Sequence, residues 1–327
     1  MKIVKPSATT LPAPTTPGEM LKHIERCGRV CYKSEDKITE GSAEKFIAGI
    51  IKRGHEAVLE HGDFCFSTDR DVWVWIKDRA ELMETFGKKC YLRFTKPGFD
   101  AHCHWLVSGN VRAWREFLKF TRPRCRLGKL PEFLKEFIND NYVLFPELQD
   151  AEFVHRSEEF RGMFDWVTDY SVLTKTERLV HQTVTALFVC DRGVTHEIVR
   201  HRPASYCQES TRYCNYGKGE FGSEITVVEP PFFKGGEYQW WKGAMKEAEM
   251  RYLGLLDKGA SPQEARSVLP NSLKTELMMT ANMQEWLHYF DLRTGVAAHP
   301  QIREVSLLLK GRMYEIVADL MEVAEHG

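Results

Sequence analysis

The strongest constraint on the fold is the helical period of the apolar residues along much of the chain. Such residues recur with that period over residues 238–258 and again over residues 300–325. The second stripe is expected to face inward through Ile302, Val305, Leu309, Met313, Ile316 and Leu320. Further helices are expected over residues 18–29, 42–53 (capped by Ser42), 70–86, 111–120, 131–137 and 195–201, and the segments 158–179 and 275–292 are compatible with helix.

Strand signals are fewer and shorter. Residues 1–4, 59–68 and 186–190 have the apolar pattern of strands, whereas the proline- and threonine-rich segment 6–17 is expected to be irregular. These patterns predict an α+β protein that is predominantly helical and has a modest sheet.

Composition limits the possible partners. The 327 residues include 45 lysines and arginines against 46 aspartates and glutamates, so no global field attracts nucleic acid or a membrane. An anionic ligand must therefore meet a local cluster of cations. The nine cysteines form no C-x-x-C pair, and no secretory leader or apolar run of membrane-spanning length is visible. We expect reduced thiols and a cytoplasmic location.

The densest polar chemistry lies in residues 196–216. Arg200, His201 and Arg202 stand where a short helix must end, and Ser210 and Arg212 follow a proline turn. Guanidinium groups pair bidentately with phosphate, and hydroxyl groups complete such a site. A single arginine cluster is more often a solvated surface. The spacing Arg-His-Arg, seven residues, Ser-x-Arg favours a phosphate site.

This spacing resembles the signature of the flavin-dependent thymidylate synthases, and two other segments agree. Residues 54–61 (GHEAVLEH) resemble the family's N-terminal block, and residues 265–293 resemble its C-terminal block. The resemblance covers residues 1–68 and 183–327. It implies one domain, 1–327, with a central antiparallel sheet, interrupted by a mostly helical insertion at about 69–182.

The resemblance also implies roles for individual residues. Arg293 is the expected catalytic residue, because a cation beside the uracil ring favours its electron-rich form. The deoxyuridylate (dUMP) contacts are Glu197, Arg200, Gln208, Ser210, Arg212, Arg266 and Arg293. The FAD contacts are His55, Arg200, His201, Arg202, Gln208, Asn282, Gln284 and His288. NADPH and methylenetetrahydrofolate are the implied co-substrates, and the implied assembly is a homotetramer whose sites are shared between chains.

Five positions depart from the commonest family pattern: Ala57, Cys207, Gln208, Gln284 and His288. They leave open an altered product, since the same reduced flavin and folate could hydroxymethylate a pyrimidine nucleotide. A non-catalytic nucleotide- or RNA-binding homologue is the third reading, although Arg200, Arg212 and Arg293 are all present. Cys207, beside basic groups, could be a nucleophile. We favour a small structural residue there.

Two other patterns are expected to be structural. Residues 102–104 (HCH) suggest zinc, but adjacent residues of an extended chain point to opposite faces, and no metal is predicted. A tryptophan cluster with Arg112 and Arg115 could stack on single-stranded nucleic acid. A packed insertion is the better interpretation of Trp73, Trp75, Trp105 and Trp114. The pair Trp240–Trp241 is likewise expected in a helix core.

Overall fold

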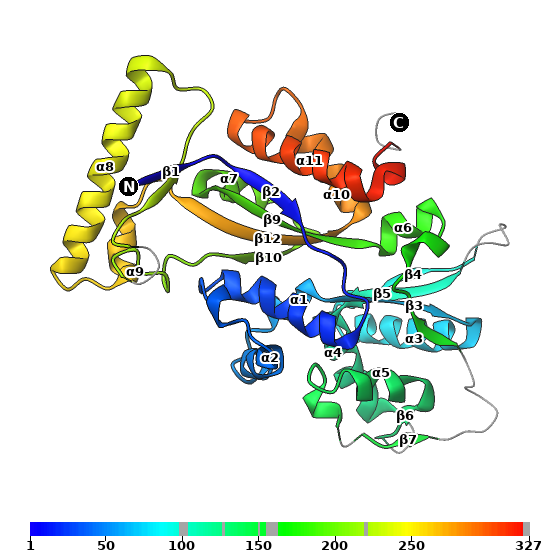
Figure 1. Ribbon diagram of the computed structural model, residues 1–327. Helices are drawn as coiled ribbons and strands as arrows, with labels where there is room; N and C mark the ends of the chain where they lie inside the picture. Colours follow the sequence, from blue (N-terminus) through cyan, green and yellow to red (C-terminus); the bar gives the residue numbers. More distant parts are fainter. Residues whose placement is uncertain (98–103, 126–127, 150, 155–162, 219–221, 323–327) are drawn as a thin grey trace.

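The computed structural model describes residues 1–97, 104–125, 128–149, 151–154, 163–218 and 222–322. Two four-stranded antiparallel sheets organise it (Figure 1). The first has the order β10-β12-β9-β2, with β10 at Ser205–Gln208, β12 at Lys274–Asn282, β9 at Thr183–Asp191 and β2 at Ser7–Thr10. None of the helices in these ranges is long and apolar enough to cross a membrane.

The first sheet is buried on both faces. Leu277 and Met279 of β12 face the core formed with α10 (Met283–Thr294) and α11 (Pro300–Met321). Met278, between them, belongs to the other core, which includes α1 (Pro17–Val30). Alternate residues of one strand therefore enter opposite cores, as the two-residue period of a strand requires.

The second sheet is built largely from the segment expected to be an insertion. Its order is β4-β5-β3-β8, with β4 at Arg93–Thr95, β5 at Trp105–Asn110, β3 at Asp63–Thr68 and β8 at Phe164–Trp166. It packs against α3 (Arg70–Thr85), α4 (Val111–Thr121) and α5 (Lys135–Asp140) (Figure 1). Phe66, Trp114 and Phe137 meet edge to face at centroid distances of 4.9–5.7 Å. The same core includes α1 and α2 (Ser42–Lys52), so the segment is not a separate body.

The remaining elements lie around these cores. The helix α8 (Gly235–Asp257) packs with the parallel pair β1 (Lys2–Val4) and β11 (Thr226–Val228), beside α9 (Pro262–Ala265). The shorter pieces are the 3-10 helix η2 (Glu56–His61), α6 (Lys175–His181), α7 (Arg192–Ile198), β6 (Leu130–Pro131) and β7 (Phe153–Val154).

The α+β class is confirmed, and so are most of the expected helices. Ser261 and Glu264 form a capping box at the start of α9, and Trp114 is fully buried with Trp73 and Trp75 packed against its core. Of the tryptophan pair, Trp241 is buried but Trp240 is 84% exposed. Residues 102 and 103 of the suspected zinc motif lie outside the described residues.

Several expectations were wrong in detail. Residues 274–282 form β12 instead of helix, because a strand covered on both faces reads as a continuous apolar run. Residues 7–10 form β2, an edge strand. Ile316 is 52% exposed, since a non-helical Val317 turns α11 and takes the buried position. Ser42 is the first helical residue, after a left-handed Gly41. The segment 69–182 also contains short strands, which the sequence did not reveal.

Candidate active site

The short helix α7 positions the Arg-His-Arg motif. Asp191 caps its start by accepting from the amide of Val194 at 2.8 Å, and the last helical residue is Ile198. The motif therefore begins where the carbonyl groups of the last turn lack helical partners. Arg200 and Arg202 are exposed, while His201 is 6% exposed and directed inward.

Arg293 contacts the C-terminal end of α7. Its Nη2 donates to the carbonyl oxygen of Glu197 at 3.1 Å, and its Nη1 lies 3.7 Å from Oε2 of the same residue. A guanidinium at a helix C-terminus interacts favourably with the helix dipole. The Nε of Arg293 is buried and has no hydrogen-bond partner in the described protein. Two residues predicted for one site, 96 positions apart, are thus in contact.

His201, Glu285 and His288 form a cluster next to Arg293 and Glu197. His201 Nε2 and His288 Nδ1 lie 3.2 and 3.6 Å from the same oxygen of Glu285, Oε2. Burial lowers the pKa of His201, although Glu285 opposes that shift. The three donor groups lie within 4.8 Å of one another, a spacing compatible with a metal ion. The resemblance assigns both histidines to the flavin, and the absence of a metal stays a prediction.

Gln208 approaches α7 from β10. Its Nε2 donates to Thr195 Oγ1 at 2.9 Å and to Thr275 Oγ1 at 3.3 Å. These two bonds orient the amide group and leave its oxygen available to a ligand.

The turn after β10 carries Ser210 and Arg212. The amide of Ser210 donates to the Cys31 carbonyl at 3.0 Å, and its hydroxyl accepts from the Arg212 amide at 3.3 Å. Beneath the turn, the buried carboxylate of Glu209 accepts from Tyr216 Oη at 2.9 Å and from Lys274 Nζ at 3.1 Å. The turn is therefore anchored, while the Arg212 side chain stays exposed.

Other predicted site residues lie away from the Glu197–Arg293 pair. Asn282 caps α10 through a 2.9 Å bond from the Glu285 amide, and His55 precedes η2 as an exposed residue. No hydrogen bond or ion pair within the described ranges joins His55, Arg212 or Arg266 to the Glu197–Arg293 pair. Arg266 and Gln284 are exposed. A pocket of about 740 Å³ lies away from these residues, along α4.

The structure also adds residues that the sequence did not single out. Glu285 joins the two histidines, and Tyr206 Oη donates to the carbonyl oxygens of Ile198 and His201. The spacing of Glu285 and His288, one helical turn apart, was the available signal for the first.

Cys207 lies in the core beneath the site. It is 3% exposed, and a hydrogen bond with Cys31 together with burial raises its pKa well above the ordinary value. A reactive cysteine needs a lowered pKa and access to solvent. The structural interpretation of Cys207 therefore agrees with the geometry.

Comparisons with known proteins place these residues in a family. The family model described as "Thymidylate synthase complementing protein" matches residues 15–75 and 161–321. Among curated relatives, flavin-dependent thymidylate synthases from Pyrococcus furiosus, Thermococcus onnurineus and Geobacter sulfurreducens are 38%, 31% and 35% identical. Those alignments cover 39%, 41% and 37% of this chain and 53%, 56% and 53% of the relatives, so the chain spans about half their length.

A crystal structure of thymidylate synthase X (ThyX) from Helicobacter pylori with FAD and dUMP also aligns. Its TM-score is 0.37 at 18% identity, over 44% of this chain and 74% of that chain. The family model matches residues of all three sequence blocks, including the N-terminal histidines, the Arg-His-Arg motif and Arg293. The chain therefore belongs to the thymidylate synthase complementing protein family.

Proposed function

We propose that this protein is a flavin-dependent thymidylate synthase. It methylates dUMP at C5 to give dTMP, with methylenetetrahydrofolate as carbon donor and FAD, reduced by NADPH, as hydride donor. The curated relatives bear this name. The eight cysteines of the described residues are free, in keeping with a cytoplasmic enzyme. We also infer that residues 69–182 are an insertion in one domain, since the family model leaves 76–160 unmatched.

The contact between Glu197 and Arg293 carries the proposal. A uracil ring is a weak nucleophile at C5, and a fixed cation beside N3 and O4 would stabilise its electron-rich form. Arg293 is suited to this task because the end of α7 already holds two of its nitrogens, which reduces reorganisation on binding. The nucleotide would be bound by Glu197 together with Arg200, Gln208, Ser210, Arg212 and Arg266. The arginines would supply positive charge for its phosphate.

One unpartnered buried atom beside this group supports a flavin site. Arg293 Nε is buried without a hydrogen-bond partner in the described residues, whereas His201 Nε2 lies 3.2 Å from Glu285 Oε2. Buried polar groups of this kind need a partner. The cofactor would be held by His201 together with Asn282, Gln284 and His288 near the start of and along α10. His55, Arg200 and Arg202 would complete its site. Bound FAD would supply the hydride, and the protein would supply position and electrostatics.

Two exposed apolar side chains near Arg293 support a homotetramer with shared sites. Leu292 and Val296, on either side of Arg293, are 50% and 86% exposed. Large apolar side chains left exposed beside a polar site are often covered by a second subunit. A second chain seated there would bring its own residues toward Arg293. Arg212 and Arg266, which form no hydrogen bond or ion pair with Arg293 within the described residues, would then contribute from a neighbouring subunit.

Replacement of the arginine tests the function. Arg293→Ala is expected to keep FAD bound but to lower dTMP formation by about a hundredfold or more, the usual effect of removing one such group. Arg312→Ala, an exposed arginine of α11, serves as the matched control and should retain activity. Wild-type turnover in Arg293→Ala would remove Arg293 from the proposed role. A product heavier than dTMP by one oxygen would show a hydroxymethylase instead.

A further inference from the structure

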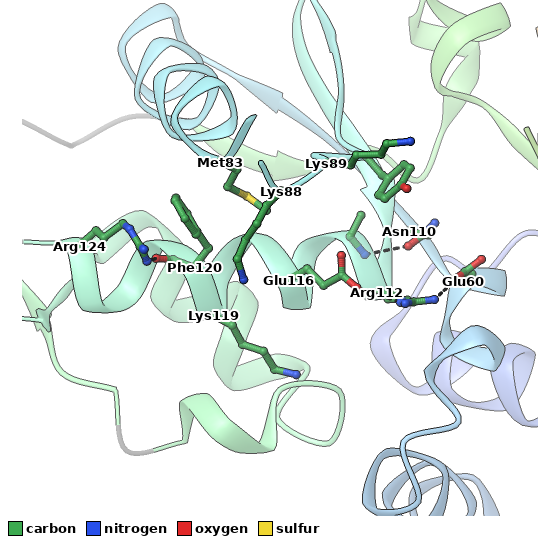
Figure 2. Close-up of a pocket in the computed structure, with 12 residues that line it drawn as sticks. Glu60, Met83, Lys88, Lys89, Asn110, Arg112, Glu116, Lys119, Phe120 and Arg124 are labelled. Atoms are coloured by element: carbon green, nitrogen blue, oxygen red, sulfur yellow. Dashed lines mark hydrogen bonds and ion pairs between the residues drawn. The ribbon is translucent and has the colours of Figure 1, made fainter. Parts of the chain in front are cut away.

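A pocket in the described part of the chain lies apart from the candidate active site. It has a volume of about 740 Å³, within the range of small-molecule sites. Its floor is the exposed face of α4, and its wall is the segment that joins α3 to β4. Figure 2 shows the side chains along α4, from Arg124 at one end to Arg112 and Glu60 at the other, with Lys88 between them. All but Glu60 belong to residues outside the family match.

Positive charge dominates this pocket, although the whole protein carries a net charge of −1. The lining has two acidic side chains, Glu60 and Glu116, and five cationic ones: Lys88, Lys89, Arg112, Lys119 and Arg124. Both acids are engaged by a single cation. Arg112 donates to Glu60 at 2.7 Å and to Glu116 at 3.0 Å (Figure 2).

The other cations have no acidic partner inside the pocket. Lys119 pairs with Glu147 at 3.2 Å, outside it. Lys88, Lys89 and Arg124 pair with no carboxylate of the described residues, and the Arg124 guanidinium lies over the Phe120 ring at 3.7 Å. Like charges gathered in a concave site repel one another and focus a positive field. A bound anion removes that repulsion.

The arrangement of the charges selects the kind of anion. They are spread along α4 and the facing wall, so an extended chain of negative charge contacts more of them than a single phosphate does. Lysine is a common phosphate ligand, acting as a point charge. Tyr91, 60% exposed at the same pocket, offers a ring on which a nucleobase can stack.

We propose that this pocket binds a polyphosphate chain, carried by a nucleoside triphosphate or present as inorganic polyphosphate. Glu60 connects the pocket to the rest of the family motif, since its Oε2 accepts from Ser205 Oγ at 3.2 Å at the start of β10. The segment 69–182 would thus give this chain a second anion site, distinct from the arginines of the candidate active site. The proposal does not depend on the proposed function.

Calorimetric titration of the full chain with ATP and, separately, with sodium tripolyphosphate tests the proposal. Both lysines are exposed, so Lys88→Glu with Lys89→Glu should leave the fold intact and weaken binding about tenfold or more. Lys246→Glu with Lys258→Glu, exposed on and just after α8, changes the net charge equally and should leave the affinity within about threefold.

The two probes distinguish the sources. Tighter binding of ATP than of tripolyphosphate, with the ATP preference lost in Tyr91→Ala, indicates a nucleotide. Equal binding of both, unchanged in Tyr91→Ala, indicates inorganic polyphosphate. The proposal is overturned if neither probe binds, or if binding survives in the Lys88/Lys89 variant, which would place the anion at another site. Because the readout is binding, it is independent of whether the protein makes dTMP.

Discussion

A buried chain of hydrogen bonds predicts how stability depends on pH. His61 Nδ1 lies 2.7 Å from Thr280 Oγ1, which lies 2.7 Å from Thr185 Oγ1, and that oxygen lies 3.0 Å from His23 Nε2. The chain joins η2 and α1 to strands β12 and β9. Burial, reinforced by the charge of His23, lowers the pKa of His61 from its ordinary value of 6.5 to about 3.

The direction of the effect follows from these values. The unfolded imidazole takes up a proton below pH 6.5, whereas the folded one stays neutral until about pH 3. Stability is therefore lost as the pH falls below about 6.5, and the loss continues down to the folded pKa. Between pH 7 and pH 5, one such group costs about 2 kcal/mol of the free energy of unfolding. His61→Gln removes this cost and should flatten the pH dependence by that amount.

Urea unfolding at pH 7, 6 and 5 measures the difference. The variant is expected to be less stable at pH 7 by about 1–3 kcal/mol, because it disturbs a buried hydrogen bond. Its stability should then fall less steeply than that of the wild type toward pH 5. His196→Gln, at an exposed position, is the control and should follow the wild type. An identical slope for His61→Gln and wild type would refute the assignment of a neutral, buried His61.

Three further expectations concern the core and the site. Leu277→Ala, at a fully buried position of β12, should lower the free energy of unfolding by about 2–5 kcal/mol; a loss below about 1 kcal/mol in urea would contradict the packing described. Cys207→Ala should keep dTMP formation within about threefold of wild type, since the thiol is buried; a folded but inactive variant would make it a nucleophile. Mixed after joint refolding, Arg293→Ala and Arg212→Ala chains should regain activity that neither has alone; failure to do so would contradict sites shared between subunits.

The sequence predicted helices well where one face is buried and the period is regular. It failed at residues 274–282, because Leu277, Met278 and Met279 are consecutive and apolar. A run buried on both sides has no period that separates strand from helix. Thr275 and Thr280 are β-branched and favour a strand. The residues that they pair with on β9 and β10 are visible only in the folded structure.

The candidate site was predictable only in part. The family resemblance implied one site for Arg200, His201 and Arg293, and the contact of Arg293 with Glu197 agrees with it. Sequence spacing could not show that Glu285 joins His201 to His288, or that His61 reaches Thr280 across 219 positions. Such contacts depend on tertiary packing. The cationic pocket was missed for the same reason, since Lys88 and Lys119 line one pocket only when the segment after α3 lies beside α4.

The central claim is tested most directly by the visible absorption spectrum of the purified protein, followed by dTMP formation from dUMP, methylenetetrahydrofolate and NADPH with added FAD. We predict a flavin spectrum and dTMP as the product. A protein that binds no flavin, even after reconstitution with FAD, and forms no dTMP would contradict the proposed function and would leave the Arg-His-Arg motif as a binding scaffold.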